Sequence, residues 1–334
     1  MEVGKLKNEV LGEIVLSEIQ SIREDVLIRP GVGEDCAAIA YGDFACVLTT
    51  DPITGSGSQL GKLAVHVCLN DIASSGAEPV GLLLTLLCPE GTSKDEIQGI
   101  LREANQTANL MGIEIVGGHT EITTAVNRTI VSATAIGKTM IDTLIKTSGA
   151  KSGDYIYLTK QVATEGTAII AYEKADELST VLTREELAQA QSLMDQISVV
   201  EEGRIAAKVG ATAMHDATEG GVLGAIHELC EASGKGCHIY HHKLKLLSVT
   251  EKICSYYNID PYRLISSGTM VITINPDLAG LLEREFLSAG IEYEWVGEIT
   301  SELEKVLIIG ETPEEQIFES IESPDSDELY KIIK

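Results

Sequence analysis

Hydrophobic and polar positions change between two periods along the chain, which predicts alternating strands and helices. Residues 43–50 (DFACVLTT) are mostly apolar and β-branched, as is typical of a strand, and Asp51 and Pro52 follow them. Residues 59–73 instead carry apolar side chains three and four positions apart, which predicts a helix. The first elements are therefore expected to be a strand followed by a helix.

The same change of period continues to the end of the first half. A helix is expected over residues 93–111, because Ser93-x-x-Glu96 forms a capping box and Gly112 follows the last turn. Short strands are expected at residues 113–116 and 128–137, where apolar and β-branched residues gather. The turn-rich segment 146–154 (KTSGAKSGD) then predicts a domain boundary.

The second half repeats this alternation. It predicts a strand at 154–159, a helix from Gly166 and another helix that begins at the capping box Thr183-x-x-Glu186. Further strands, with helices between them, are expected at residues 211–216, 268–274 and 293–299, and the last ~20 residues are acidic and predict a frayed end. We therefore expect two α/β domains, residues 1–148 and 149–334.

Charge narrows the possible partners. The 334 residues include 25 Lys+Arg against 51 Asp+Glu, and the formal net charge of −26 disfavours nucleic acid and anionic membranes as partners. Most of these carboxylates are expected on a solvated surface, while a few could converge on Mg²⁺, which prefers oxygen ligands.

The N-terminus lacks a signal-peptide pattern, and the longest apolar run, residues 80–88, is about half as long as a membrane helix. Seven scattered cysteines without a C-x-x-C pair predict free thiols and a cytoplasmic protein.

Residues 55–62 (GSGSQLGK) resemble a phosphate-binding P-loop but do not match it. The motif G-x-x-x-x-G-K-[ST] needs four residues between its glycines and a hydroxyl after the lysine. Gly57 is one residue too close to Gly61, Gly55 is one too far, and Leu63 stands at the hydroxyl position. A nucleotide would have to be bound in another way.

Acidic residues lie beside glycine turns or strand ends at several places. Asp35 lies in GVGEDCAAI, Asp51 ends a predicted strand, Asp71 lies late in the following helix, and Glu121 follows the Gly117-Gly118 turn. Carboxylates in these places can converge, because ligands of α/β folds gather at the carboxyl ends of strands. Each one alone is more often a turn or capping residue.

Other polar residues have two interpretations each. Lys62, His66 and Asn70 are four residues apart and share one helix face, which could bind phosphate or could simply face solvent. His119 could be a ligand, a base or a turn residue. Asp216 in HDATEGG could cap a helix. The His-rich HIYHHK, residues 238–243, has no ligand-spaced partner and is not predicted to be a metal site.

Five of these motifs together resemble one superfamily. GVGEDCAAI, LTTDPI, LGKLAVHVCLNDIASSGAEP, IVGGHTEIT and MHDATEGGVLGAI occur in the order seen in the superfamily of AIR synthetase (PurM). This superfamily also contains the hydrogenase-maturation protein HypE, thiamine-monophosphate kinase and selenophosphate synthetase. The resemblance extends from Gly4 to about Gly310 and is greatest to HypE and its AIR synthase-related relatives.

The resemblance implies a two-domain PurM-like fold, which is α/β (α+β) in class. It also implies a phosphoryl-transfer reaction. Its N-terminal domain would bind ATP and Mg²⁺ and form a β-barrel with its twin in a homodimer, with a C-terminal α+β sandwich beside it. The reaction would transfer phosphoryl from ATP to an amide, carbonyl or phosphate oxygen of a small molecule. The implied metal ligands are Asp35, Asp51, Asp71, Glu121 and Asp216, although His119 takes the place of the usual acid in the GG-[DE]-T turn. The implied nucleotide contacts are Lys5, Gly33, Thr50, Lys62, Asn70, Gly118 and Thr120, with Lys62, His119 and Asp216 in catalysis.

The sequence leaves two functional classes open. HypE carries its carbamoyl group on a C-terminal cysteine, whereas no cysteine follows Cys254 here, so we do not expect standard HypE chemistry. The first hypothesis is an ATP- and Mg²⁺-dependent enzyme with an unknown small-molecule substrate. The second is a HypE-like scaffold that binds nucleotide or a partner protein without turnover. The retained acids favour the first hypothesis, since clustered buried charges are costly to keep.

Overall fold

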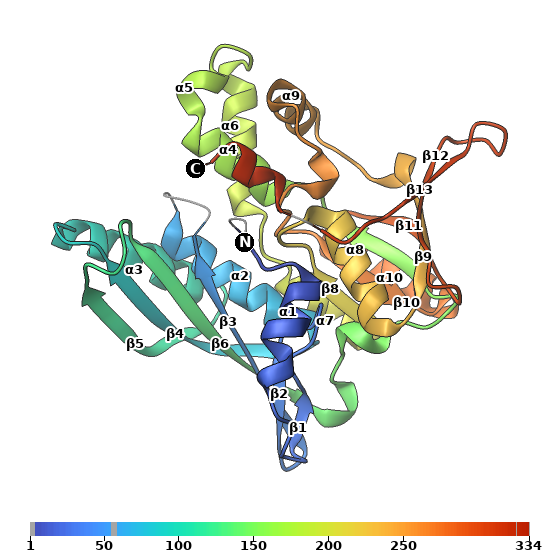
Figure 1. Ribbon diagram of the computed structural model, residues 1–334, viewed down its shortest axis with the longest axis horizontal. Coiled ribbons are helices and arrows are strands. Elements are labelled where there is room, and N and C mark those ends of the chain that lie inside the picture. Colours follow the sequence, from blue (N-terminus) through green and yellow to red (C-terminus); the bar gives the residue numbers. More distant parts are fainter. Residues whose placement is uncertain (1–3, 55–58, 325, 334) are drawn as a thin grey trace.

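The computed structural model describes residues 4–54, 59–324 and 326–333, and each half of the chain forms one mixed β-sheet with helices (Figure 1). This confirms the two-domain α/β fold class. The first half of the glycine-rich run that resembles a P-loop, residues 55–58, lies outside the described residues.

The N-terminal half forms a six-stranded sheet of order β1-β2-β3-β6-β4-β5. Its neighbouring strands are antiparallel, except that β4 and β5 run parallel. The elements are α1 (Asn8–Ile14), β1 (Val26–Ile28), β2 (Ala37–Tyr41), β3 (Phe44–Ile53), α2 (Leu60–Ser74), β4 (Glu78–Cys88), α3 (Lys94–Leu110), β5 (Glu114–Ile122) and β6 (Ile130–Met140).

The C-terminal half forms a seven-stranded sheet of order β13-β12-β9-β11-β7-β10-β8. Its strands are β7 (Tyr155–Thr159), β8 (Ala213–Asp216), β9 (Gly236–Tyr240), β10 (Met270–Ile274), β11 (Tyr293–Thr300), β12 (Lys305–Ile309) and β13 (Ile317–Ser320). Its helices are α4 (Thr164–Glu173), α5 (Ala175–Leu178), α6 (Arg184–Ser192), α7 (Val200–Val209), α8 (Gly221–Ser233), α9 (Ser248–Tyr257) and α10 (Pro276–Ala289).

One face of the N-terminal sheet is covered by α2 and α3, and the opposite face is open. Along β4, Leu82, Leu84 and Leu86 are buried beneath the helices, as the period of two requires. On the open face Phe44, Leu83 and other large apolar side chains remain exposed.

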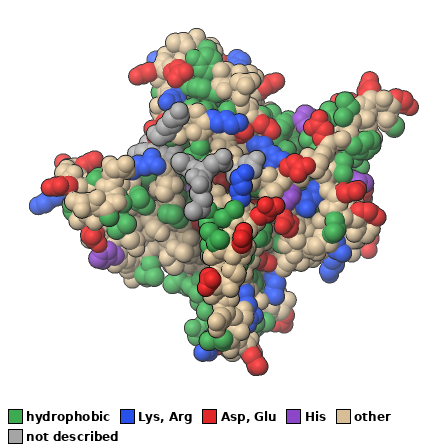
Figure 2. Space-filling model, viewed as in Figure 1, with side chains coloured by type: hydrophobic (Ala, Val, Ile, Leu, Met, Phe, Trp, Pro, Cys, Tyr) green, Lys and Arg blue, Asp and Glu red, His purple; other side chains and the backbone are tan. Residues whose placement is uncertain are grey.

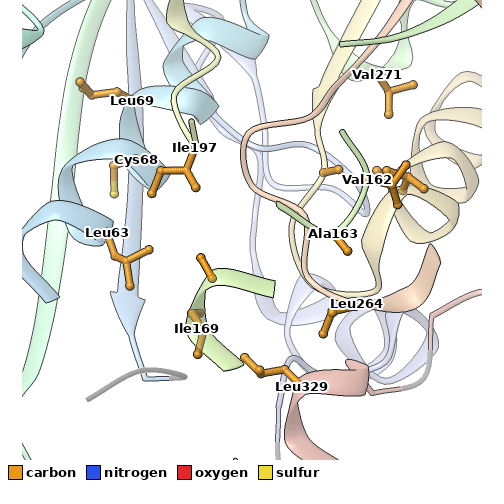
Figure 3. Close-up of a cluster of buried hydrophobic side chains, with 14 of the residues drawn as sticks. Leu63, Cys68, Leu69, Val162, Ala163, Ile169, Ile197, Leu264, Val271 and Leu329 are labelled. Carbon is orange, nitrogen blue, oxygen red and sulfur yellow. The ribbon is translucent and has the colours of Figure 1, made fainter. Parts of the chain in front are cut away.

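Helix α2 lies between the two domains, so it is apolar on almost every side. Its buried residues face both the N-terminal sheet and the C-terminal half, where α2 contacts α7 and β8. One continuous hydrophobic core therefore spans both halves, and Figure 3 shows Leu63 and Cys68 of α2 in the same cluster as Ile197 and Ile169. A second core lies between the C-terminal sheet and helices α7 and α10.

Both capping boxes are confirmed. The side chains of Ser93 and Thr183 accept hydrogen bonds from the backbone N–H groups of Glu96 and Glu186, and each glutamate accepts the reciprocal bond. The two helices begin where the sequence predicts, because these bonds are local.

The expected frayed C-terminus is wrong for the described residues. Residues 317–320 form β13, and a 3-10 helix, η7 (Glu328–Lys331), follows with Asp327 as its N-cap. Buried Ile321 and Leu329 anchor this segment in the core that both domains share. Among the described residues, no helix combines the length and apolarity needed to cross a bilayer.

Asn70 links the two domains through two buried hydrogen bonds. Its Nδ2 donates to the carbonyl oxygen of Ile197 at 2.7 Å, and its Oδ1 accepts from the N–H of Val199 at 2.8 Å. Asn70 is fully buried, so water cannot replace either bond.

We expect Asn70→Ala to lower the free energy of unfolding by about 2–4 kcal/mol, because it leaves two buried backbone groups without partners. Urea unfolding measures this change. Asn105→Ala, at an exposed position of α3, serves as control and should change it by less than about 0.5 kcal/mol. Equal, small effects of the two substitutions would show that the link contributes nothing.

Candidate functional site

A cavity of about 530 Å³ lies between the two domains. Its N-terminal-domain wall comes from the loop before β2, the end of β3 and one side of α2, and its C-terminal-domain wall from α4 and the loops before α8 and β10. The N-terminal segment and η7 meet at its rim, where Gly4 packs against the ring of Tyr330. Figure 3 shows three of its apolar wall residues, Leu63, Ile169 and Leu329.

The four predicted aspartates converge on one side of this cavity. Asp35, Asp51 and Asp71 line it, while Asp216, at the end of β8, is fully buried next to them. The Thr49 hydroxyl donates to Asp71 at 2.5 Å and lies 3.4 Å from an oxygen of Asp51. Ligand atoms of Asp35, His215 and Asp216 all lie within 4.8 Å of one another. Strand ends and α2 thus bring together carboxylates that are far apart in the sequence.

The electrostatics of this cluster are unfavourable when it is empty. Burial raises the pKa of Asp71 well above its usual range, and the charges of Asp51, Asp216 and Asp35 raise it further. Burial and Asp35 likewise raise the pKa of Asp216. Neither carboxylate oxygen of Asp216 has a hydrogen-bond partner among the described residues. Buried oxygens without donors and with mutual repulsion fit a divalent cation, which would supply the missing positive charge.

His215 holds one member of the cluster in place. Its Nδ1 lies 2.8 Å from Asp35, and its Nε2 lies 3.2 Å from Glu228. Burial opposes a charge on His215, but the two carboxylates outweigh this and raise its pKa to about 10. The imidazole is therefore protonated at neutral pH and donates from both nitrogens.

Lys5 extends this network to the cavity. Its ammonium lies 3.7 Å from Glu228, and the carboxylates around it, Glu228 foremost, raise its pKa to about 12 against the effect of burial. Lys5, Glu228, His215 and Asp35 form one chain of alternating charges. Sequence reasoning identified Lys5 and Asp35 but missed His215 and Glu228, although His215 directly precedes Asp216 in HDATEGG.

Gly33 is placed beside this network for a steric reason. Its φ of +75° is unfavourable for other residues, and a Cβ there would lie 3.0 Å from the Glu228 carbonyl oxygen. The loop of Gly33 lines the cavity and packs directly on α8. Glycine is therefore required here by the close contact between the loop and α8.

The predicted polar face of α2 lies against the other domain and not in solvent. Lys62 forms an ion pair with Asp195, Asn70 bonds residues 197 and 199, and His66 is buried between them. Burial lowers the pKa of His66 to about 4, and Lys62 and Lys160 lower it too, so His66 is neutral. None of the three lines the cavity. The spacing indicates phosphate binding or a solvent-facing surface for this helix face. It does not indicate a domain interface, which is where the structure places the three residues.

The predicted residues of the GGHTE segment lie apart from the aspartates. His119 and Glu121, 3.3 Å from each other, pair with Thr85 and Leu87 of β4 on the open face of the sheet, and both are exposed. Gly118 is required there because a Cβ would lie 1.9 Å from the Leu84 carbonyl oxygen. Neither Gly118 nor Thr120 lines the cavity.

Thr50 is also on the open face. It follows Thr49 and precedes Asp51, which both point toward α2, and its hydroxyl donates to the Ala133 carbonyl oxygen at 3.0 Å. Successive side chains of a strand point to opposite faces, so the structure separates Thr50 from its two neighbours.

Other residues of the cavity were not predicted. Arg128 lines it and donates to the Thr54 carbonyl oxygen, and Glu165 and Ser267 line its C-terminal-domain wall. No local motif marks these residues in the sequence.

Comparisons with known proteins place this geometry in a family. Residues 33–139 match the N-terminal domain of AIR synthase related proteins, and residues 151–310 match the C-terminal domain of the same family. A putative hydrogenase expression/formation protein of Methanocaldococcus jannaschii is 28% identical over 317 residues, which is 91% of each chain.

Solved structures share the fold. A chain in the crystal structure of a HypE–HypF complex superposes with a TM-score of 0.77 at 23% identity, covering 94% of this chain and 99% of that one. HypE in complex with ATP gives a TM-score of 0.69 at 17% identity and covers 95% and 91%. The fold is therefore PurM-like, as the sequence predicts, and since the family matches span both domains, the chain belongs to the AIR synthase related protein family.

Proposed function

We propose that this protein is an ATP- and Mg²⁺-dependent enzyme that transfers a phosphoryl group to an oxygen of a small molecule, either an amide, a carbonyl or a phosphate. The observation that carries the proposal is the convergence of Asp35, Asp51, Asp71 and Asp216 at one interdomain cavity. The similarity in fold to HypE in complex with ATP supports a nucleotide there. We further propose that residues 1–148 bind the nucleotide and that residues 149–334 form the second domain.

The four aspartates would hold Mg²⁺ through their carboxylate oxygens. When bound, the ion supplies the positive charge that phosphoryl transfer requires on the phosphate oxygens. The unpartnered oxygens of Asp216 and the raised pKa of Asp71 support this assignment, because both indicate negative charge that the protein itself does not neutralise.

The protein's own cations would bind the phosphates. Lys5 and Arg128 line the same cavity as the aspartates, and so does the loop of Gly33. His215 would act as a positioning residue, because it fixes one oxygen of Asp35 from the side away from solvent. Lys62 and Asn70 would have to leave Asp195 and residues 197–199 to reach a nucleotide, so we assign them to the domain interface.

A scaffold that binds nucleotide or a partner protein without turnover is the second candidate. The similarity in fold to a chain in the crystal structure of a HypE–HypF complex favours this candidate, because that structure is a complex of two different proteins. ADP release from MgATP, measured across small amides, carbonyl compounds and phosphate esters, separates the two. Binding of MgATP without ADP release in any mixture would support the scaffold.

We also propose that the open face of the N-terminal sheet pairs with the same face of a second copy. Tyr41, Phe44, Leu83 and Met140 expose large apolar surfaces there, in a chain whose net charge is −26. His119, Glu121 and Thr50 would then lie at the dimer interface.

Asp51→Asn and Asp71→Asn should each weaken MgATP binding by roughly tenfold or more, because each removes one charged ligand. Isothermal titration calorimetry measures the affinity with and without Mg²⁺. Neither variant should be less stable than the wild type, since each removes one of several mutually repelling charges. Exposed Asp43→Asn serves as the matched control, and wild-type affinity in both site variants would contradict the assignment.

Leu83→Glu should convert a dimer into a monomer, because it places a charge in the middle of the proposed apolar interface. Sedimentation-velocity ultracentrifugation reports the mass directly. Leu287→Glu, at an exposed position of α10, is the control and should leave the mass unchanged. A dimer that survives Leu83→Glu, or a monomeric wild type, would refute the interface.

A further inference from the structure

The C-terminal-domain wall of the cavity carries a second acidic group that the proposed metal site does not use. Glu165 lies in the first turn of α4, Glu219 in the loop before α8, and Asp327 just before η7. All three line the cavity, as does Ser267. They belong to the domain opposite Asp51 and Asp71, so the cavity has two distinct acidic walls.

Glu165 is the member of this group whose carboxylate has an oxygen without a hydrogen-bond donor. Glu165 is only 3% exposed, and its Oε2 has no hydrogen-bond partner among the described residues. Ser267, also fully buried, lies beside Glu165. Asp327, in contrast, already accepts at 2.8 Å from the N–H of Gly220 and from that of Leu329.

A buried carboxylate in this position is unfavourable without a ligand. Burial raises the pKa of Glu165 to about 7, and the charges of Glu219 and Asp327 raise it further, whereas the polar groups of Ser267 oppose the change. The cations of the cavity are engaged elsewhere, Lys5 with Glu228 and Arg128 with the Thr54 carbonyl oxygen. A positive ligand group would therefore meet both an unpartnered acceptor and a favourable potential.

The spacing of its carboxylates sets this wall apart from the Asp35 cluster. Within the described parts of the chain, Asp35, His215 and Asp216 form the one group whose ligand atoms come within 4.8 Å of one another. The oxygens of Glu165, Glu219 and Asp327 do not all come that close to one another. Apolar Ile169, Ile265 and Leu329 lie beside them and would contact carbon atoms.

We propose that Glu165, with Ser267 and Glu219, forms a subsite for a cationic nitrogen group, a primary ammonium or an amidinium, on the acceptor substrate. This assignment rests on the proposed function, since it takes the same cavity as the place where ATP and acceptor meet. Glu165 accepts the central hydrogen bond, and the apolar residues of α4 and η7 cover the carbon chain. The subsite would select amine-bearing acceptors over neutral or anionic ones.

The test uses butylammonium as probe and butan-1-ol as its neutral isostere, with binding followed by ligand-observed NMR on the full-length protein. We expect butylammonium to bind and butan-1-ol to bind at least about tenfold more weakly, because the alcohol lacks the charge. Glu165→Gln should weaken butylammonium binding by about tenfold or more, and Glu185→Gln, exposed on α6, should leave it unchanged. Glu165→Gln should unfold at the same temperature as the wild type or higher at pH 8, because it removes a buried charge.

The outcomes distinguish this inference from the proposed function. Glu165→Gln should retain wild-type MgATP affinity, while Asp71→Asn should lose MgATP affinity and retain butylammonium. Equal binding of butylammonium to wild type and Glu165→Gln, no binding at all, or equal binding of butan-1-ol would overturn the subsite. If the wild type fails to bind MgATP but binds butylammonium through Glu165, the cation site stands and the proposed enzyme does not.

Discussion

Repulsion among buried carboxylates is the constraint on which this structure depends. Asp35, Asp51, Asp71 and Asp216 come from four separate segments, yet the charges of Asp51, Asp216 and Asp35 all raise the pKa of buried Asp71. Such a cluster costs folding free energy at neutral pH, since at least part of it must stay charged in a medium of low polarity. The protein offsets some of this cost internally, because protonated His215 lies between Asp35 and Glu228. The charge that remains is the physical reason to expect a cation from solution.

The domain interface makes this costly arrangement possible. Helix α2 carries Asp71 and is held on one side by the N-terminal sheet and on the other by the C-terminal half. Its polar residues Lys62 and Asn70 bind residues 195–199, so the helix cannot turn to expose Asp71 to water without breaking those bonds. Most other acidic residues are not buried, and Figure 2 shows many of them spread over this face of both domains.

Local signals predicted much of the fold but not the directions of side chains. Capping boxes at Ser93 and Thr183 fixed helix starts correctly, because the interactions join residues three apart. The apolar run at residues 80–88 belongs to the long strand β4, which the sequence does not reveal, since a buried strand and a buried helix look alike in such a run. Thr50 and Asp51 belong to the same motif, LTTDPI, but their side chains point to opposite faces of β3. Only Asp51 therefore lies at the cavity.

Non-local packing accounts for what the sequence could not reveal at the candidate site. The convergence of the aspartates followed from the family resemblance and from their positions at strand ends, whereas His215 and Glu228 join the site only through the contact of α8 with the loop of Gly33. Glu165 reaches the cavity from a helix whose pattern is simply that of a buried helix. Spacing by four correctly put Lys62, His66 and Asn70 on one face, but spacing cannot tell a solvent-facing surface from a domain interface.

The most direct test of the central claim is a crystal structure with an ATP analogue in which Mn²⁺ replaces Mg²⁺ and is located by its anomalous scattering. We predict an anomalous peak bound by oxygens of Asp51 and Asp71, with Asp35 or Asp216 also in contact and the phosphates on its open side. A peak bound to other residues, or a nucleotide outside the cavity with no ion among these four side chains, would contradict it.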